Sequence, residues 1–184
     1  MRGALSFIVL LFALTGLARA DGIALAIDRI GAGSYVVYSD GSRSFTNVYR
    51  GQTGPHWVVD LVEGADPNGP QISREYRDWL GQVVRIDYAN GAVFRFNPHD
   101  CQRTPGPCIF TQTSPDGTTQ QGRITTPTRN GYSYELKIIP DRGDAVLVSS
   151  GVMVLDAMGG FARGTITAQD GTVTVVRQVQ AVYR

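Results

Sequence analysis

The chain has 184 residues, of which 42% are hydrophobic and 18% are charged, and its formal net charge is +1. A charge so close to zero argues against a dedicated nucleic-acid binder and against a protein held on membranes by a polybasic surface. The length suits a single domain that can bury its own hydrophobic core.

The first 20 residues have the pattern of a secretory signal peptide. A basic residue at position 2 precedes an unbroken apolar run over residues 7–14, and a small-residue cleavage site ends at Ala20. That run is shorter than the roughly 20 residues that a transmembrane helix needs. We therefore expect residues 1–20 to be removed. Residues 21–184 should then form one exported, soluble β-rich domain with no membrane-spanning segment, either periplasmic, if the source is a Gram-negative bacterium, or secreted.

Strand patterns dominate the rest of the chain, in which apolar and polar residues alternate between Asp-Gly and Asn-Gly pairs. Such pairs tolerate positive φ and are typical of hairpin turns. They stand at residues 40–41, 90–91, 116–117, 130–131 and 170–171. The pattern predicts a mainly β fold, either an antiparallel β-barrel or a β-sandwich built of hairpins, because both architectures use the same alternation.

A short helix is the one exception that the sequence predicts, near residues 74–80. Ser73 can cap its first turn, Gly81 can end it, and the spacing of Tyr76 and Trp79 places both aromatic side chains on one helix face.

The hairpin around residues 90–91 can be tested by asking which loop length puts apolar residues on the same face. A two-residue loop pairs Ile86 with Arg95, whereas a three-residue loop with a left-handed glycine pairs Ile86 with Phe94. We expect the three-residue loop there.

The same test favours a shorter loop in the hairpin around residues 170–171. A two-residue loop pairs Ile166 with Val175 and Ala168 with Val173, so that four apolar side chains share one face. This register leaves Thr167 opposite Thr174, and we expect it.

Cys101 and Cys108 are the two cysteines of the chain, and the Pro-Gly-Pro sequence at residues 105–107 favours a reversal of direction between them. Thiols in an oxidising compartment pair when geometry allows. We expect a disulfide that closes this loop, which leaves neither cysteine for metal binding or nucleophilic chemistry.

The two histidines are the weakest candidates for chemistry. His99, Asp100 and Cys101 are consecutive, so they cannot converge on one metal ion without unusual backbone geometry, and His56 is distant in sequence. A hydrolase or a metal-dependent enzyme that uses His56 or His99 with Asp100 stays as an alternative. We expect no cofactor, no bound metal and no catalytic residue.

Aromatic residues provide the candidate binding surface. Tyr76, Trp79, Trp57 and Tyr49 belong to a group of tyrosines, tryptophans and arginines whose composition is that of a protein-binding patch wherever it is exposed. Most aromatic residues of a β fold nevertheless fill its core.

The sequence favours a non-enzymatic binding or interaction domain of the bacterial periplasm or envelope. Its partner would be a protein or another envelope component, recruited by the aromatic surface or by addition of a strand to an exposed sheet edge. The second hypothesis is a carrier of a small apolar ligand, which would occupy a cavity inside a barrel. Nucleic acid is not expected as a partner.

Overall fold

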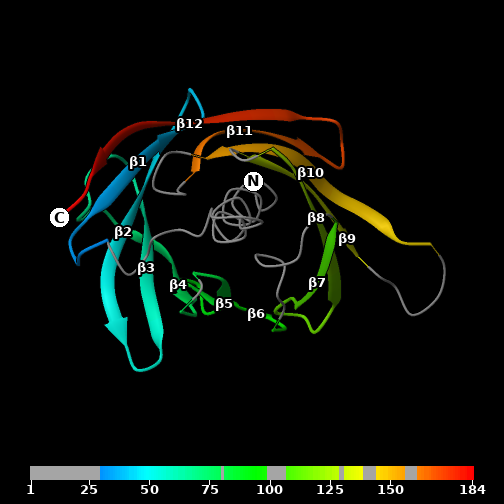
Figure 1. The fold of residues 1–184 in the computed structure, drawn as a ribbon, viewed down its shortest axis with the longest axis horizontal. Helices are drawn as coiled ribbons and strands as arrows, with labels where there is room; N and C mark the ends of the chain where they lie inside the picture. Colours follow the sequence, from blue (N-terminus) through cyan, green and yellow to red (C-terminus); the bar gives the residue numbers. More distant parts are fainter. Residues whose placement is uncertain (1–29, 80, 99–106, 129–130, 139–143, 156–160) are drawn as a thin grey trace.

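The computed structural model shows a closed barrel of antiparallel strands (Figure 1). It describes residues 30–79, 81–98, 107–128, 131–138, 144–155 and 161–184, and every structural statement below concerns these residues. The predicted signal peptide lies outside them.

Twelve strands follow one another along the chain and around the barrel, because each pairs with its neighbours in sequence. They are β1 (Tyr35–Ser39), β2 (Ser44–Thr53), β3 (His56–Glu63), β4 (Gln71–Arg77), β5 (Val83–Tyr88), β6 (Val93–Phe96), β7 (Cys108–Thr113), β8 (Thr119–Thr128), β9 (Gly131–Ile138), β10 (Val146–Leu155), β11 (Phe161–Ala168) and β12 (Val173–Val182).

The barrel closes between the first and the last strand, since β1 pairs with β2 on one side and with β12 on the other. Two hydrogen bonds of 2.9 Å reinforce this seam: the Gly31 N–H donates to the Arg184 carbonyl, and the Arg184 N–H donates to the Ser34 hydroxyl. The fold is therefore a barrel and not a sandwich. Each described strand has a partner on both sides, so the expected addition of a strand to an open edge is wrong for this part of the chain.

The core lies inside the ring of strands, because alternate side chains of each strand point inward. Large inward residues come from all sides of the barrel, and none of the following exposes more than 8% of its surface: Tyr38, Phe45, Tyr49, Leu61, Ile86, Phe96, Phe110, Tyr134, Met153, Phe161 and Ile166.

Glycines in the wall make room for these rings. A Cβ atom built on Gly122 would lie 2.1 Å from the ring of Phe110, which pairs with it across β7 and β8. Tyr134 lies in the same way against Gly151, its cross-strand partner on β10. The ring occupies the space that a second side chain would need, so these positions require glycine.

The helix expected over residues 74–80 is wrong, because the segment up to Arg77 forms β4. Ser73, Glu75 and Arg77 alternate with more exposed residues and point inward, and β3 and β5 supply the backbone partners on either side. A pairing between strands that satisfies the backbone on both sides outweighs a local helix preference of a few tenths of a kcal/mol per residue.

A buried ion pair results from this alternation. Glu75 and Arg77 each expose 1% of their side chains, the Arg77 Nε–H donates to Glu75 Oε2 at 3.1 Å, and Arg77 Nη1 donates to the Gly81 carbonyl at 3.1 Å. Burial raises the pKa of Glu75, against the opposing effect of Arg77. Burial and the charge of Glu75 together raise the pKa of Tyr88, which is also on the inner side of the wall.

The hairpin between β5 and β6 has the predicted register. Ile86 pairs with Phe94, and Gly91 adopts φ of +86° at the end of a three-residue loop. The glycine provides the left-handed backbone that this bulged turn requires.

The hairpin between β11 and β12 differs by one residue from the prediction. Ile166 pairs with Thr174, not with Val175, and Gly171 adopts φ of +82° in a turn with the same backbone hydrogen bonds as the β5–β6 turn. A shift of one residue moves a strand's side chains to its other face. Val173 and Val175 therefore lie outside the barrel.

We expect Glu75→Gln to lower the free energy of unfolding by about 3–5 kcal/mol, because it leaves the Arg77 charge buried without its carboxylate. Urea denaturation measures the loss, and Glu63→Gln at an exposed position is the matched control. A double variant, Glu75→Leu with Arg77→Met, should recover most of the stability. A loss of less than about 1 kcal/mol for Glu75→Gln would contradict a structural role for the pair.

Candidate functional site

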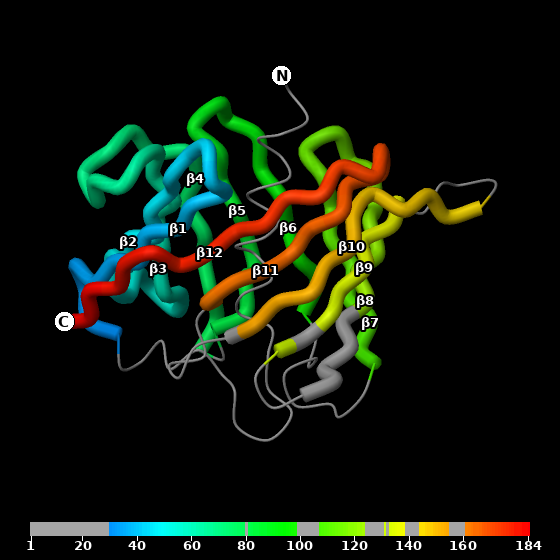
Figure 2. The backbone as a smooth tube through the Cα atoms, turned by 90° about the horizontal axis from the view of Figure 1, so that it is seen from above, coloured from blue at the N-terminus to red at the C-terminus, as the bar shows by residue number. Residues whose placement is uncertain are grey.

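Three adjacent strands present an unusual outer surface. Figure 2 looks onto β12, β11 and β10, which lie side by side. One cross-strand row consists of Val152, Thr165 and Val175, and the next consists of Val154, Arg163 and Arg177. We call this surface the valine–arginine face; it also includes Val173 and Val179 of β12.

Exposed apolar side chains concentrate there. Of nine large hydrophobic residues that are exposed in the described part of the chain, four belong to this face: Val152, Val173, Val175 and Val179. Val152, Val173 and Val179 each expose between 56% and 60% of their surface. Single exposed apolar residues are ordinary, whereas a contiguous group of them marks an interaction surface.

Two arginines of the face stand directly opposite each other. Arg163 pairs with Arg177 across β11 and β12, both are exposed, and no described acidic residue forms an ion pair with either one. The chain contains a useful comparison: Arg85 stands opposite Arg95 across β5 and β6, and there Asp87 binds Arg85 in a two-fold ion pair. Like charges directly opposite each other destabilise a sheet, and among the described residues a carboxylate offsets this effect at the β5–β6 pair alone.

Two surface depressions border the face. One, of about 270 Å³, is lined by Ser39, Asp40, Gly41, Val175, Arg177 and Val179. The other, of about 360 Å³, has lining residues from β8 to β11 that include Arg123, Glu135, Ser150, Val152 and Thr165. The apolar face is thus continuous with hollows that carry polar groups at their rims.

The two carboxylates in these depressions are already engaged. Asp40 forms an ion pair with Arg43 at 3.2 Å, and Glu135 forms one with Lys137 at 3.5 Å. Neither carboxylate forms an ion pair with Arg163 or Arg177.

The sequence analysis missed this face because it assigned the wrong register to the last hairpin. With that register Val173 and Val175 would be buried. The signal that could have corrected it is the Asp-Gly pair itself, since the same kind of turn at residues 90–91 was assigned three residues.

The four aromatic residues predicted to form a binding surface do not come together. Tyr49 lies in the core inside the barrel, and Trp57 packs partly buried against that core. Tyr76 lies on the outer face of β4 beneath the Arg85 guanidinium, which is 5.3 Å from its ring centroid. Trp79 follows β4 and exposes 69% of its surface.

The candidate metal and catalytic residues are separated in the same way. His56 begins β3, where its ring meets the edge of Tyr76 at a centroid distance of 6.4 Å. His99 and Asp100 lie outside the described residues. Within the described ranges, no three His, Cys, Asp or Glu side chains are grouped so that they could hold a metal ion.

The predicted disulfide stays a prediction. Cys108 is buried at the start of β7, and Cys101 lies outside the described residues.

In the described part of the chain, the structure contains no helix with the length and apolar character that crossing a bilayer requires.

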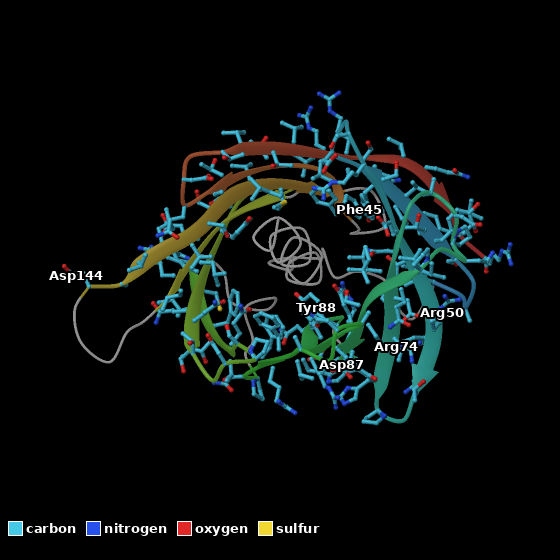
Figure 3. All side chains as sticks on the ribbon, turned by 180° about the vertical axis from the view of Figure 1, so that it is seen from behind. Phe45, Arg50, Arg74, Asp87, Tyr88 and Asp144 are labelled. Atoms are coloured by element: carbon cyan, nitrogen blue, oxygen red, sulfur yellow. The ribbon has the colours of Figure 1, made fainter. Side chains whose placement is uncertain are left out.

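A second cluster of charged residues, on the outer face of the sheet, stabilises the fold. Asp60 of β3 is buried between Arg50 and Arg74, which lie next to each other in Figure 3. Arg74 donates to both Asp60 oxygens at 2.7 and 3.0 Å, and Arg50 donates at 2.9 Å. Burial alone would raise the pKa of Asp60, but the hydrogen bonds from the two arginines outweigh it and hold the pKa below its usual value.

No protein-family model matches the sequence, and a search of curated proteins finds no match. Among solved structures, the chain is similar to a protein of Bacteroides fragilis NCTC 9343 that has a YmcC-like fold. The two share 9% sequence identity with a TM-score of 0.38, over 83% of this chain and 97% of the other. A likeness at this level carries no argument about function.

We expect Asp60→Asn to lower the free energy of unfolding at pH 7 by about 1–2 kcal/mol, a value discounted because both arginines are partly exposed. A carboxyl group whose pKa is lowered by folding stabilises the protein above its unfolded-state pKa, near 4, and this contribution is lost as the pH falls through the folded pKa. The difference between the wild type and Asp60→Asn should therefore shrink below about pH 4.

Urea denaturation at a series of pH values measures this difference, with Asp144→Asn at an exposed position as the control. A difference that stays constant down to pH 2 would contradict a stabilising role for ionised Asp60.

Proposed function

We propose that this protein is a non-enzymatic binding domain whose valine–arginine face holds a protein partner, and that it acts in the periplasm or envelope after export. The observation that carries the proposal is the concentration of exposed apolar side chains on β10 and β12. An apolar centre with arginine and a polar border is the composition of a protein interface.

The geometry suits a broad, rigid contact. The three strands belong to a closed sheet, so the face is held in place without a partner. Little ordering entropy is then lost when another surface packs on it. The depressions at both borders add places where side chains of a partner can insert.

The other hypotheses receive less support from the described residues. The two depressions reported above both lie on the outer surface, where they favour a partner over a ligand carried inside the barrel. His56 has an aromatic neighbour in Tyr76 and no grouped acid or cysteine among the described residues, which offers little basis for a hydrolase or a metal-dependent enzyme.

The proposal is tested by placing a photo-activated cross-linking amino acid at Val175 in the full chain and irradiating the native host. We expect one dominant cross-linked species, which mass spectrometry identifies. Val152→Asp on the adjacent strand should abolish that species while leaving the melting temperature nearly unchanged, because Val152 exposes 56% of its surface.

Ile109 provides the matched control, because it is an equally exposed apolar residue on β7, away from the face. A cross-linker at Ile109 should not give the same species, and Ile109→Asp should not reduce cross-linking from Val175. Equal labelling from both positions, or a species that survives Val152→Asp, would overturn the proposal.

A further inference from the structure

We infer that the partner of the valine–arginine face is a protein that places an acidic side chain between Arg163 and Arg177, where its carboxylate binds both guanidinium groups. This inference rests on the proposed function, because it concerns the chemistry of the partner at the same face.

Two like charges held directly opposite each other reduce the stability of the protein when no partner is bound. Residues directly opposite each other in an antiparallel sheet have Cβ atoms about 4.5–5.5 Å apart, so the two guanidinium groups share one small region of the surface. At the otherwise similar pair of Arg85 and Arg95, Asp87 supplies the missing negative charge. No described acidic residue forms an ion pair with Arg163 or Arg177, so a carboxylate from outside can take this position.

The two guanidinium groups of the site are chemically matched to a carboxylate. A guanidinium group presents parallel N–H donors that match the two oxygens of a carboxylate, and arginine is favoured where such pairs are buried at interfaces. Val175 and Val179 flank Arg177 on the same strand. A partner that covers these valines would exclude water from the ion pair and strengthen it.

An anionic lipid surface fits the valine–arginine face less well than another protein does. The apolar groups of the face are short valines on a sheet, interleaved with Thr165 and Thr167. Peripheral membrane binding uses clustered basic residues with larger apolar or aromatic side chains that enter the lipid. The net charge of the chain is close to zero, so the face is better matched to the side chains of another protein.

The cost to the protein alone can be measured without the partner. Arg163→Gln and Arg177→Gln should each raise the melting temperature by about 1–3 °C, and the double variant should rise by less than the sum, because either change removes the same repulsion. Arg85→Gln is the matched control and should lower the melting temperature, since it removes the ion pair with Asp87.

Recognition is tested with the protein purified after expression of the full chain, and with an array of synthetic peptides made in pairs. The two peptides of a pair are identical except that aspartate or glutamate in one is asparagine or glutamine in the other. We expect the bound peptides to combine valine, leucine or isoleucine with an acidic residue, and the amide version to bind at least about tenfold more weakly. Arg163→Gln and Arg177→Gln should weaken binding of the acidic peptides equally, and Arg95→Gln should not.

Binding that is indifferent to the acid-to-amide change, or to both arginine variants, would overturn the inference. So would binding to phosphatidylglycerol vesicles that the two variants abolish while no acidic peptide binds. Failure of this inference can be distinguished from failure of the proposed function. If cross-linking from Val175 is lost in Val152→Asp but persists in the double arginine variant, the face binds a partner, but no carboxylate of that partner bridges the two arginines.

Discussion

Closure of the hydrogen-bond ladder between β1 and β12 is the constraint on which the rest of the structure depends. Once Val36 pairs with Ala181 and Arg184 is bound to Gly31 and Ser34, every described strand has two neighbours. A closed sheet has one inside and one outside, so period-two alternation assigns each side chain to one of these two sides. Both the filled interior wall and the exposed valine–arginine face follow from that single topological fact.

The alternation of side chains in the closed sheet places polar residues inside the barrel as well as apolar ones. Ser73, Glu75 and Arg77 point inward because their strand alternates, and the ion pair of Glu75 and Arg77 limits the cost of burying two charges. On the outer face, Asp60 is compensated by Arg50 and Arg74. Charges held by their own neighbours stabilise the barrel, whereas no described acidic residue forms an ion pair with Arg163 or Arg177. The contrast separates residues that serve the fold from those that we assign to recognition.

Several features of the fold can be predicted from residues that are close in sequence. The three-residue turn at Gly91 and the pairing of Ile86 with Phe94 follow from local alternation and the need for positive φ. The strand that ends at Arg77 could not be predicted in this way. The local spacing of its residues is that of a helix, and the partners that make it a strand lie on β3 and β5. The valine–arginine face was equally hidden, since one residue of register decides whether Val175 is buried or exposed. The observed register pairs Val175 with Thr165, whereas the predicted register paired it with Ile166.

The sequence by itself determined the mainly β, hairpin-built character of the protein, because alternation and Asx-Gly turns are local properties that each segment carries alone. The tertiary structure decided three things: that the sheet closes, that Tyr49 and Trp57 belong inside while Tyr76 and Trp79 lie outside, and that Arg163 meets Arg177. The first two outcomes depend on contacts between residues far apart in the chain. The third depends on one residue of register in the β11–β12 hairpin. A candidate site on the surface of a barrel is therefore visible only after every strand has been placed.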